Sequence, residues 1–157
     1  MKIFIGSDHA GYDFKEKLKV YLEDMGHEVK DQGAFSYDIE DDYPDFIRPV
    51  AESVASGRGS IGIILGASGQ GEAICANRVK GARAALYYGE PGKSQTDAGG
   101  RVLDLISSAR AHNNANILSL GIRFLSEDEA KEAVRVFLHT DFTGEERHIR
   151  RINKLDA

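Results

Sequence analysis

The sequence predicts an α/β fold: a three-layer α/β/α sandwich around a Rossmann-like sheet of five parallel strands. Three observations predict it. The chain has 157 residues, a length that suits about one domain. Short, almost wholly apolar runs recur, as expected for strands that are buried on both faces of a parallel sheet. Stretches with apolar residues at helical spacing separate these runs, and this alternation is typical of β-α units.

The first half of the chain supplies two such units. Residues 2–6 (KIFIG) form the first predicted strand, and apolar residues at helical spacing follow as far as Gly26, a residue typical of helix C-terminal caps. A second, short strand is expected over residues 28–31. Pro44 or Pro49 can occupy the first turn of the next helix, where a missing backbone N–H is tolerated.

Three further strands are predicted in the second half. Residues 61–65 (IGIIL) are almost wholly apolar and are expected to lie at the centre of the sheet, and runs at 82–88 and 117–120 are similar. The polar, glycine-rich stretch 89–101 interrupts the pattern. We expect it to be a long surface loop, not a linker between domains, so residues 1–157 should form a single domain.

Two helices are expected near the C-terminus. Ser126 and Glu129 have the spacing of a capping box that opens a helix over residues 127–138. A basic helix is expected over about residues 145–155.

Composition excludes several classes of protein. With 41% apolar residues, 29% charged residues and a formal net charge of -5, the chain is neither disordered nor a general nucleic-acid binder. It has no apolar run of about 18 residues and no signal-peptide pattern, so we expect a cytoplasmic protein without a membrane span. Cys75, the one cysteine, excludes an intramolecular disulfide and any multi-cysteine metal site.

The segment 66–72 (GASGQGE) is the first candidate for chemistry. It lies between the most apolar strand and a helical pattern, so it should sit at the carboxyl end of a central strand, where α/β sheets bind ligands. Its glycines allow backbone amides to approach an anion. The alternative is a tight turn without a ligand. The spacing is not that of a dinucleotide-binding loop, and GKS at 92–94 lacks the earlier glycine of a P-loop.

Asp8 and His9 end the first strand and should lie at the same sheet edge. An acid beside an imidazole can hold sugar hydroxyls or exchange protons. Alternatively, Ser7 or Asp8 is simply a helix N-cap beside a solvated histidine. His112 and Asn113, before the last strand, carry the same ambiguity. The histidines show no metal-ligand spacing, so we predict no metal.

The last candidate is a basic cluster near the C-terminus. Arg147 and Arg151 are four residues apart and share a helix face, where two guanidinium groups could hold a phosphate monoester. The alternative is that these charges only match the helix dipole, with Glu145 and Glu146 at the start of the helix and the basic residues further along.

Together these segments resemble the B-type ribose-5-phosphate isomerase family, which includes galactose-6-phosphate isomerase subunits and allose-6-phosphate isomerases. The resemblance covers nearly the entire chain. Its carriers are residues 5–11 (IGSDHAG), 42–45 (DYPD), 64–72 (ILGASGQGE), 76–78 (ANR), 112–116 (HNNAN), 120–121 (LG) and 147–151 (RHIRR).

The resemblance implies a cofactor-free, metal-free isomerase that interconverts ribose 5-phosphate and ribulose 5-phosphate through an enediolate. Glu72 would be the base and His112 would assist ring opening, while Asp8 would hold sugar hydroxyls. Tyr43 and Asn113 would line the sugar site. One family branch has a cysteine base at the position of Gly66, which this sequence lacks. Partial burial could raise the pKa of Glu72 towards neutrality.

Other residues would bind charge on the substrate. The loop amides from Ser68 to Gly71 would stabilise the enediolate, with catalytic Ser68 and substrate-binding Gly66, Gly69 and Gly71. The phosphate would bind to His9, Arg123, Arg147 and Arg151.

The resemblance also implies a homodimer, or a dimer of dimers, with active sites shared between subunits. The stretch 89–101 makes this region about a dozen residues longer than is usual in the family, so a six-carbon substrate such as allose 6-phosphate or galactose 6-phosphate is an alternative. A non-catalytic phosphosugar sensor on the same fold is another alternative.

Overall fold

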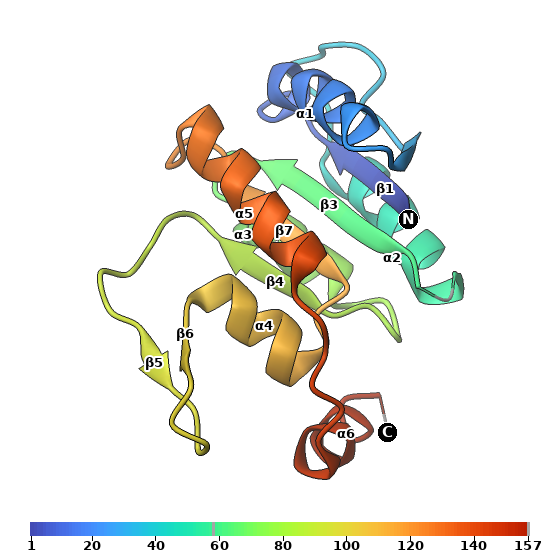
Figure 1. Ribbon diagram of the computed structural model, residues 1–157. Coiled ribbons are helices and arrows are strands. Elements are labelled where there is room, and N and C mark those ends of the chain that lie inside the picture. Colours follow the sequence, from blue (N-terminus) through green and yellow to red (C-terminus); the bar gives the residue numbers. More distant parts are fainter. Residues whose placement is uncertain (58, 157) are drawn as a thin grey trace.

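The computed structural model describes residues 1–57 and 59–156. In this part of the chain, five parallel strands form the main sheet, in the order β2-β1-β3-β7-β4 (Figure 1). Their bounds are β1 Lys2–Ser7, β2 Glu28–Asp31, β3 Ile61–Gly66, β4 Ala84–Tyr87 and β7 Ile117–Gly121. All five strands expected from the sequence are therefore present, and the predicted fold class is confirmed.

Helices cover both faces of this sheet (Figure 1). The helices are α1 (Tyr12–Asp24), α2 (Pro44–Ser56), α3 (Gln70–Ala76), α4 (Leu105–Asn113), α5 (Glu127–His139) and α6 (Glu146–Ile152). Helices α1, α4 and α5 share one apolar cluster with the sheet, and α2 and α3 share the other. Helix α6 lies apart from the sheet at one end of the molecule (Figure 1).

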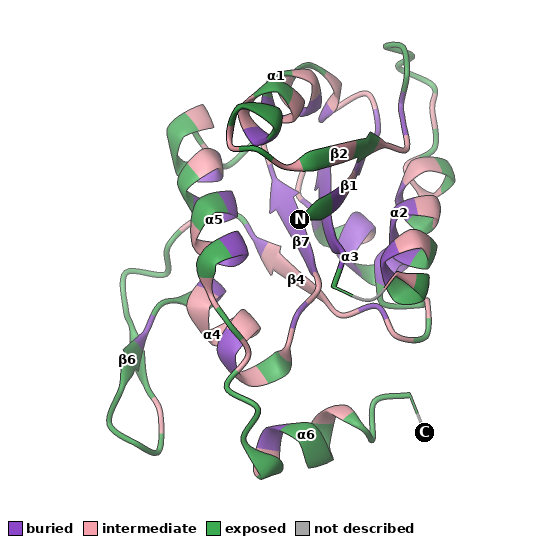
Figure 2. Ribbon diagram, turned by 45° about the vertical axis from the view of Figure 1, so that its right-hand side comes forward, coloured by how far each residue is buried: buried purple, intermediate pink, exposed green. Residues whose placement is uncertain are grey.

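The core surrounds β3, all of whose residues are buried (Figure 2). Ile63 and Leu65 belong to the cluster under α1, α4 and α5, whereas Ile64 belongs to the cluster under α2 and α3. Successive side chains of a strand point to opposite faces, so a strand that is covered on both faces must be apolar throughout. This requirement explains the IGIIL run.

The sheet has its switch point between β1 and β3. Ser7 of β1 is level with Leu65 of β3, so the two strands end side by side. Helix α1 follows β1 onto one face of the sheet, whereas α3 follows β3 onto the other. The chain therefore leaves these adjacent strand ends in opposite directions, which opens the crevice where α/β proteins bind ligands.

The helix starts and ends predicted from Gly26, Pro44 and the Ser126–Glu129 pair are confirmed. Gly26 has a φ of +83° directly after the cap of α1, and Pro44 occupies the first turn of α2, while Pro49 lies inside that helix. At the start of α5, the Ser126 and Glu129 side chains each bond to the other's backbone N–H, which is the predicted capping box. None of the helices in the described ranges is long and apolar enough to span a membrane.

Three local features differ from the expectations. The stretch 89–101 is not wholly a loop, because it contains β5 (Gln95–Thr96), which pairs antiparallel with β6 (Val102–Leu103) just beyond it. His112 and Asn113 end helix α4 instead of lying in a loop. Helix α6 ends at Ile152, short of residue 155. The hairpin strands have only two residues each, too few to show alternation in the sequence.

Candidate active site

The glycine loop after β3 is held tightly against the neighbouring strand β7. Gly69, the N-cap of α3, has a φ of +72°, and its carbonyl accepts a 2.7 Å hydrogen bond from the Ser119 hydroxyl. A Cβ atom at Gly69 would lie 2.7 Å from Leu86 Cδ1. Because both the backbone angle and the space exclude a side chain, glycine is required here.

Glu72 lies in the first turn of α3 and is only 5% exposed. Its carboxylate lies directly over Gly66, since a Cβ atom on that glycine would be 1.9 Å from Glu72 Oε1. Burial raises the pKa of Glu72, and the charge of Asp8 raises it further, while the backbone amide of Glu72 acts in the opposite direction. A buried carboxylate with a raised pKa is suited to accepting a proton from carbon.

Asp8 is buried beside this carboxylate at the end of β1. Its Oδ1 accepts hydrogen bonds from the backbone N–H groups of Ala10 (3.0 Å) and Gly11 (3.3 Å). The N-cap of α1 is Gly11 and has no side-chain cap, so the alternative that Ser7 or Asp8 caps this helix is wrong. The two hydrogen bonds from Ala10 and Gly11 orient the Asp8 carboxylate.

His9 is paired with a residue that the sequence analysis did not identify. Its Nδ1 lies 2.6 Å from Asp41 Oδ1, which also accepts a hydrogen bond from the His9 backbone N–H. This bond to Asp41 raises the pKa of His9, and Asp8 adds to the effect. The pair therefore favours a positively charged imidazole at the sheet edge. Asp41 is 32 positions away, and no local pattern links it to His9.

Asp8, His9 and Asp41 also form a cluster of candidate metal ligands. One ligand atom each from Asp8, His9 and Asp41 lie within 4.8 Å of one another, a cluster that sequence spacing did not reveal. The 2.6 Å contact between the imidazole and Asp41 is a hydrogen-bond distance, so these two atoms share a proton instead of facing a common ion.

Three other predicted residues surround the loop. The Tyr43 ring covers Gly71, where a Cβ atom would be 3.0 Å from Tyr43 Cζ. The Ser68 hydroxyl accepts a hydrogen bond from the Gln70 backbone N–H. Arg123 is exposed just after β7, and its charge acts on His9, which shows that the two lie near each other. This edge of the sheet thus combines a buried acid pair with cationic groups.

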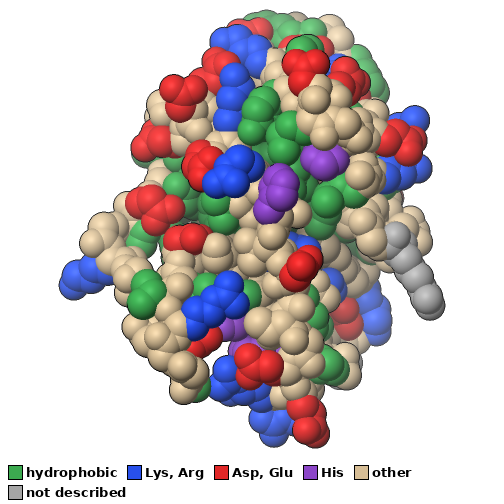
Figure 3. Space-filling view, viewed as in Figure 1, with side chains coloured by type: hydrophobic (Ala, Val, Ile, Leu, Met, Phe, Trp, Pro, Cys, Tyr) green, Lys and Arg blue, Asp and Glu red, His purple; other side chains and the backbone are tan. Residues whose placement is uncertain are grey.

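The remaining predicted residues lie at the opposite edge of the sheet. Helix α4 runs from the carboxyl end of β4 back to the amino end of β7, so His112 and Asn113 in its last turn are at the amino edge. Together with Arg151 and His148 of α6, they line a pocket of about 760 Å³. Figure 3 shows Lys and Arg side chains gathered at this end of the molecule.

The fold therefore divides the predicted site residues of one chain into two groups, which lie at opposite edges of the sheet. The carboxyl edge brings together Asp8, His9, Tyr43, Gly66, Ser68, Gly69, Gly71, Glu72 and Arg123. The amino edge carries His112, Asn113, Arg147 and Arg151.

Two further residues contact His112. The His148 ring stacks on it with a centroid distance of 4.6 Å and an interplanar angle of 9°, and Asp97 Oδ2 lies 3.7 Å from its Nε2. Burial lowers the pKa of His148, and the charge of His112 lowers it further. Arg147 of the same helix pairs with Glu145 at 2.8 Å.

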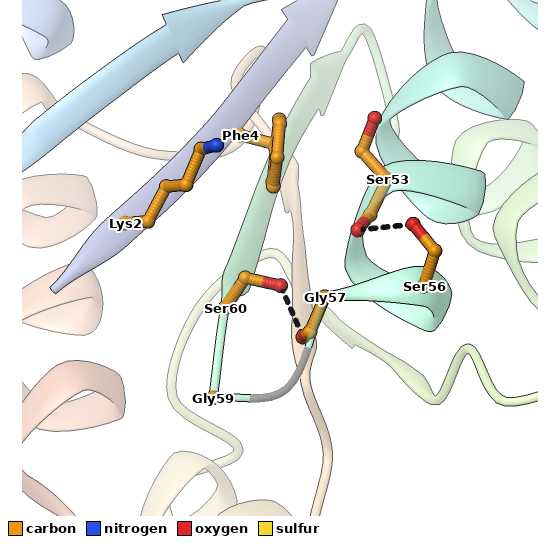
Figure 4. Close-up of a pocket in the computed structure, with 7 residues that line it drawn as sticks. All are labelled: Lys2, Phe4, Ser53, Ser56, Gly57, Gly59 and Ser60. Carbon is orange, nitrogen blue, oxygen red and sulfur yellow. Dashed lines mark hydrogen bonds between the residues drawn. The ribbon is translucent and has the colours of Figure 1, made fainter.

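A separate pocket of about 310 Å³ lies near the amino ends of β1 and β3 (Figure 4). Its hydroxyl groups bond locally: Ser60 Oγ donates to the Gly57 carbonyl (2.7 Å) and Ser56 Oγ to the Ser53 carbonyl (3.1 Å). Of the described residues that line it, none is a predicted site residue, and Lys2 alone carries a charge. We therefore place the active site elsewhere.

A family model described as Ribose/Galactose Isomerase matches residues 3–97 and 103–155 of the chain. The chain belongs to this family. A relative named ribose-5-phosphate isomerase B, from Mycobacterium tuberculosis, is 41% identical over 155 residues, which is 99% of this chain and 88% of the relative. The family resemblance drawn from the motifs is confirmed.

Solved structures of the family agree with the fold. A ribose 5-phosphate isomerase from Thermotoga maritima is 42% identical with a TM-score of 0.83, covering 99% of this chain and 97% of its own. Ribose-5-phosphate isomerase B from Mycoplasma genitalium is 36% identical with a TM-score of 0.84, covering 98% and 93%, and that structure contains bound ribulose-5-phosphate.

Proposed function

We propose that the chain is an aldose-ketose isomerase that interconverts ribose 5-phosphate and ribulose 5-phosphate in the cytoplasm. The observation that carries this proposal is the buried Glu72 carboxylate, which lies over Gly66 and has a raised pKa. A base of this kind is what proton transfer between adjacent sugar carbons requires. The relatives named ribose-5-phosphate isomerase B, and the bound ribulose-5-phosphate in one of them, support this substrate.

The proposed reaction moves one proton between two carbons. Glu72 removes the proton from C2 of the open-chain aldose, the C–H electron pair forms a C1–C2 double bond, and the carbonyl electrons move to O1. Glu72 then returns the proton to C1, while the O2 hydroxyl proton passes to O1 and the O2 electrons form the ketose carbonyl. Amides from Ser68 to Gly71 stabilise the enediolate oxygen, and Asp8 holds the sugar hydroxyls.

The amino-edge residues complete the site. His112 assists ring opening, and Asn113 lines the sugar site together with Tyr43 of the carboxyl edge. The phosphate binds to basic residues. Because the two groups lie at opposite sheet edges of one chain, we infer that a second copy supplies His112, Asn113, Arg147 and Arg151. The protein then works as a homodimer or a dimer of dimers with shared active sites.

Turnover by chelator-treated protein tests this proposal, with ribose 5-phosphate and allose 6-phosphate compared in parallel. We expect ketose formation from the five-carbon sugar without added metal or cofactor. The Glu72→Gln variant should lose roughly 10²- to 10⁴-fold in kcat. The control is Glu23→Gln, the same change at an exposed position of α1, which should leave the rate unchanged.

The pH profile gives a second readout. Glu72 must be ionised to accept a proton, so kcat/KM should fall as the pH drops through its pKa. Since burial raises that pKa above the ordinary value of 4.5, the fall should begin at a higher pH than an exposed glutamate would give. Preference for the six-carbon sugar would change the substrate but keep the mechanism. Tight binding of both sugars without turnover would favour a sensor.

A further inference from the structure

The β5–β6 hairpin carries a charged residue into the amino-edge group. The family match includes β5 and Asp97 but not residues 98–102, which form the rest of the hairpin turn and the start of β6. The hairpin is held to α4 by a hydrogen bond from the Gln95 side chain to the Ser108 hydroxyl. Its turn begins at Asp97, directly after β5.

The two carboxylate oxygens of Asp97 have different partners. Oδ1 accepts hydrogen bonds from the backbone N–H groups of Gly99 (2.8 Å) and Arg101 (2.9 Å), whereas Oδ2 lies 3.7 Å from His112 Nε2. The Asp97 and His112 side chains are only 12% and 15% exposed. The amides of Arg101 and Gly99 hold the pKa of Asp97 below its usual value, so the carboxylate stays charged. The turn therefore fixes a negative charge beside one ring nitrogen of His112.

Other contacts fix the plane of the imidazole. The His148 ring is stacked on His112 at 4.6 Å, and burial lowers the pKa of His148, which favours a neutral neighbour. His112 itself is in the last turn of α4. Other charged groups around this pocket are Arg83, Glu145, Arg147, Arg151 and Asp156.

We propose that Asp97 is a positioning residue for the reaction: it orients the His112 ring and keeps a proton on Nε2, so that Nδ1 exchanges the proton with the sugar. This inference rests on the proposed function, in which His112 assists ring opening. A carboxylate beside one imidazole nitrogen sets the tautomer and orientation of the ring without itself becoming protonated.

The ring-opening step then balances as follows. The bond between C1 and the ring oxygen breaks, its electron pair stays on that oxygen, and the oxygen takes the Nδ1 proton of the imidazolium. The anomeric hydroxyl loses its proton to water, and its electrons form the C1 carbonyl. His112 is left neutral with its proton on Nε2, the tautomer that Asp97 stabilises.

The test compares Asp97→Asn with Asp24→Asn, the same change at an exposed position of α1. Asparagine keeps an oxygen for the turn amides and removes the charge that faces His112. We expect kcat for ribose 5-phosphate to fall by about tenfold, with KM within about twofold of wild type. The imidazole nitrogen-15 resonances of His112, assigned with His112→Gln, should shift at fixed pH in Asp97→Asn and not in Asp24→Asn.

Other outcomes would overturn either this inference or the proposed function. Unchanged kcat and unchanged His112 resonances in Asp97→Asn would overturn the inference, and so would a higher KM at constant kcat, because the hairpin would then only shape the pocket. A wild-type protein that is inactive on ribose 5-phosphate would refute the proposed function instead. The nitrogen resonances would still report whether Asp97 sets the His112 tautomer.

Discussion

Gly66 and Glu72 share one small space at the end of β3. A side chain on residue 66 and the carboxylate of residue 72 cannot both occupy it, since a Cβ atom would be 1.9 Å from Glu72 Oε1. The resemblance implies two family branches, one with a cysteine base at the position of residue 66 and one with a glutamate base at the position of residue 72. The overlap gives a physical reason for them, because a side chain from either position reaches the same point. Glycine at 66 is thus required by the Glu72 carboxylate, not by the backbone.

The first prediction follows from this overlap. Gly66→Ala should push the Glu72 carboxylate aside and lower kcat by roughly 100-fold, the cost of misplacing a catalytic group by about 1 Å. The control is Gly62→Ala in the same strand, where a Cβ atom would be 2.9 Å from Ile117 Cγ1. That variant should melt at a lower temperature but keep the wild-type kcat per folded molecule. Equal losses of kcat in the two variants would mean that strand disruption is responsible.

At the scale of elements, two short helices form the amino-edge group. The last turn of α4 presents His112, and α6 presents Arg151 towards the same pocket. Their relative placement depends on the stacked His112 and His148 rings and on the segment between α5 and α6, where the Thr143 hydroxyl donates to the Ala111 carbonyl (3.0 Å). A basic helix far along the chain thereby lines the same pocket as His112.

The arginines of α6 can be tested separately. Arg151→Ala should raise KM for ribose 5-phosphate and Ki for inorganic phosphate by roughly 10- to 100-fold, as loss of a hydrogen bond between charged groups gives. Arg150→Ala removes the same charge from the adjacent exposed position and is the control. If both variants raised KM equally, long-range charge alone would explain the effect, and Arg151 would not contact the phosphate.

At the scale of the whole molecule, the direction of the strands separates the predicted site residues. All five strands of the sheet run the same way, so every loop after a strand lies at one edge and every helix end before a strand lies at the other. Glu72 belongs to the first edge and His112 to the second. A site that uses both needs two copies of the chain.

Complementation tests this arrangement. Glu72→Gln and His112→Gln should each be inactive alone, but subunit exchange between them should restore activity. In a random mixture, half of the dimers are mixed and each has one intact site of two, so about a quarter of wild-type activity is expected. Each variant taken through the same exchange alone is the control. No recovery, despite mixed dimers detected by mass spectrometry, would contradict sites shared between subunits.

Most of the fold could be read from local patterns, and the site only in part. The five strands, the α5 capping box and the glycine loop depend on short-range periodicity and turn chemistry. The β5–β6 hairpin was missed because two-residue strands show no alternation and because Asp97 organises the turn through backbone amides. Helix α4 was not predicted either. The roles of the site residues remain predictions for the variants described above.

Local patterns were therefore enough to predict the five strands of the main sheet and the residue types of the proposed chemistry, because each of these depends on neighbours a few positions apart. The motifs taken together indicated the family. Folding decided which of those residues meet. The pairs His9–Asp41 and His112–Asp97 join residues that no local pattern links. The overlap of Glu72 with Gly66 lies within the 66–72 segment, but the turn into α3 decides it. Separation of the site into two sheet edges likewise follows from strand direction, a property of the assembled sheet.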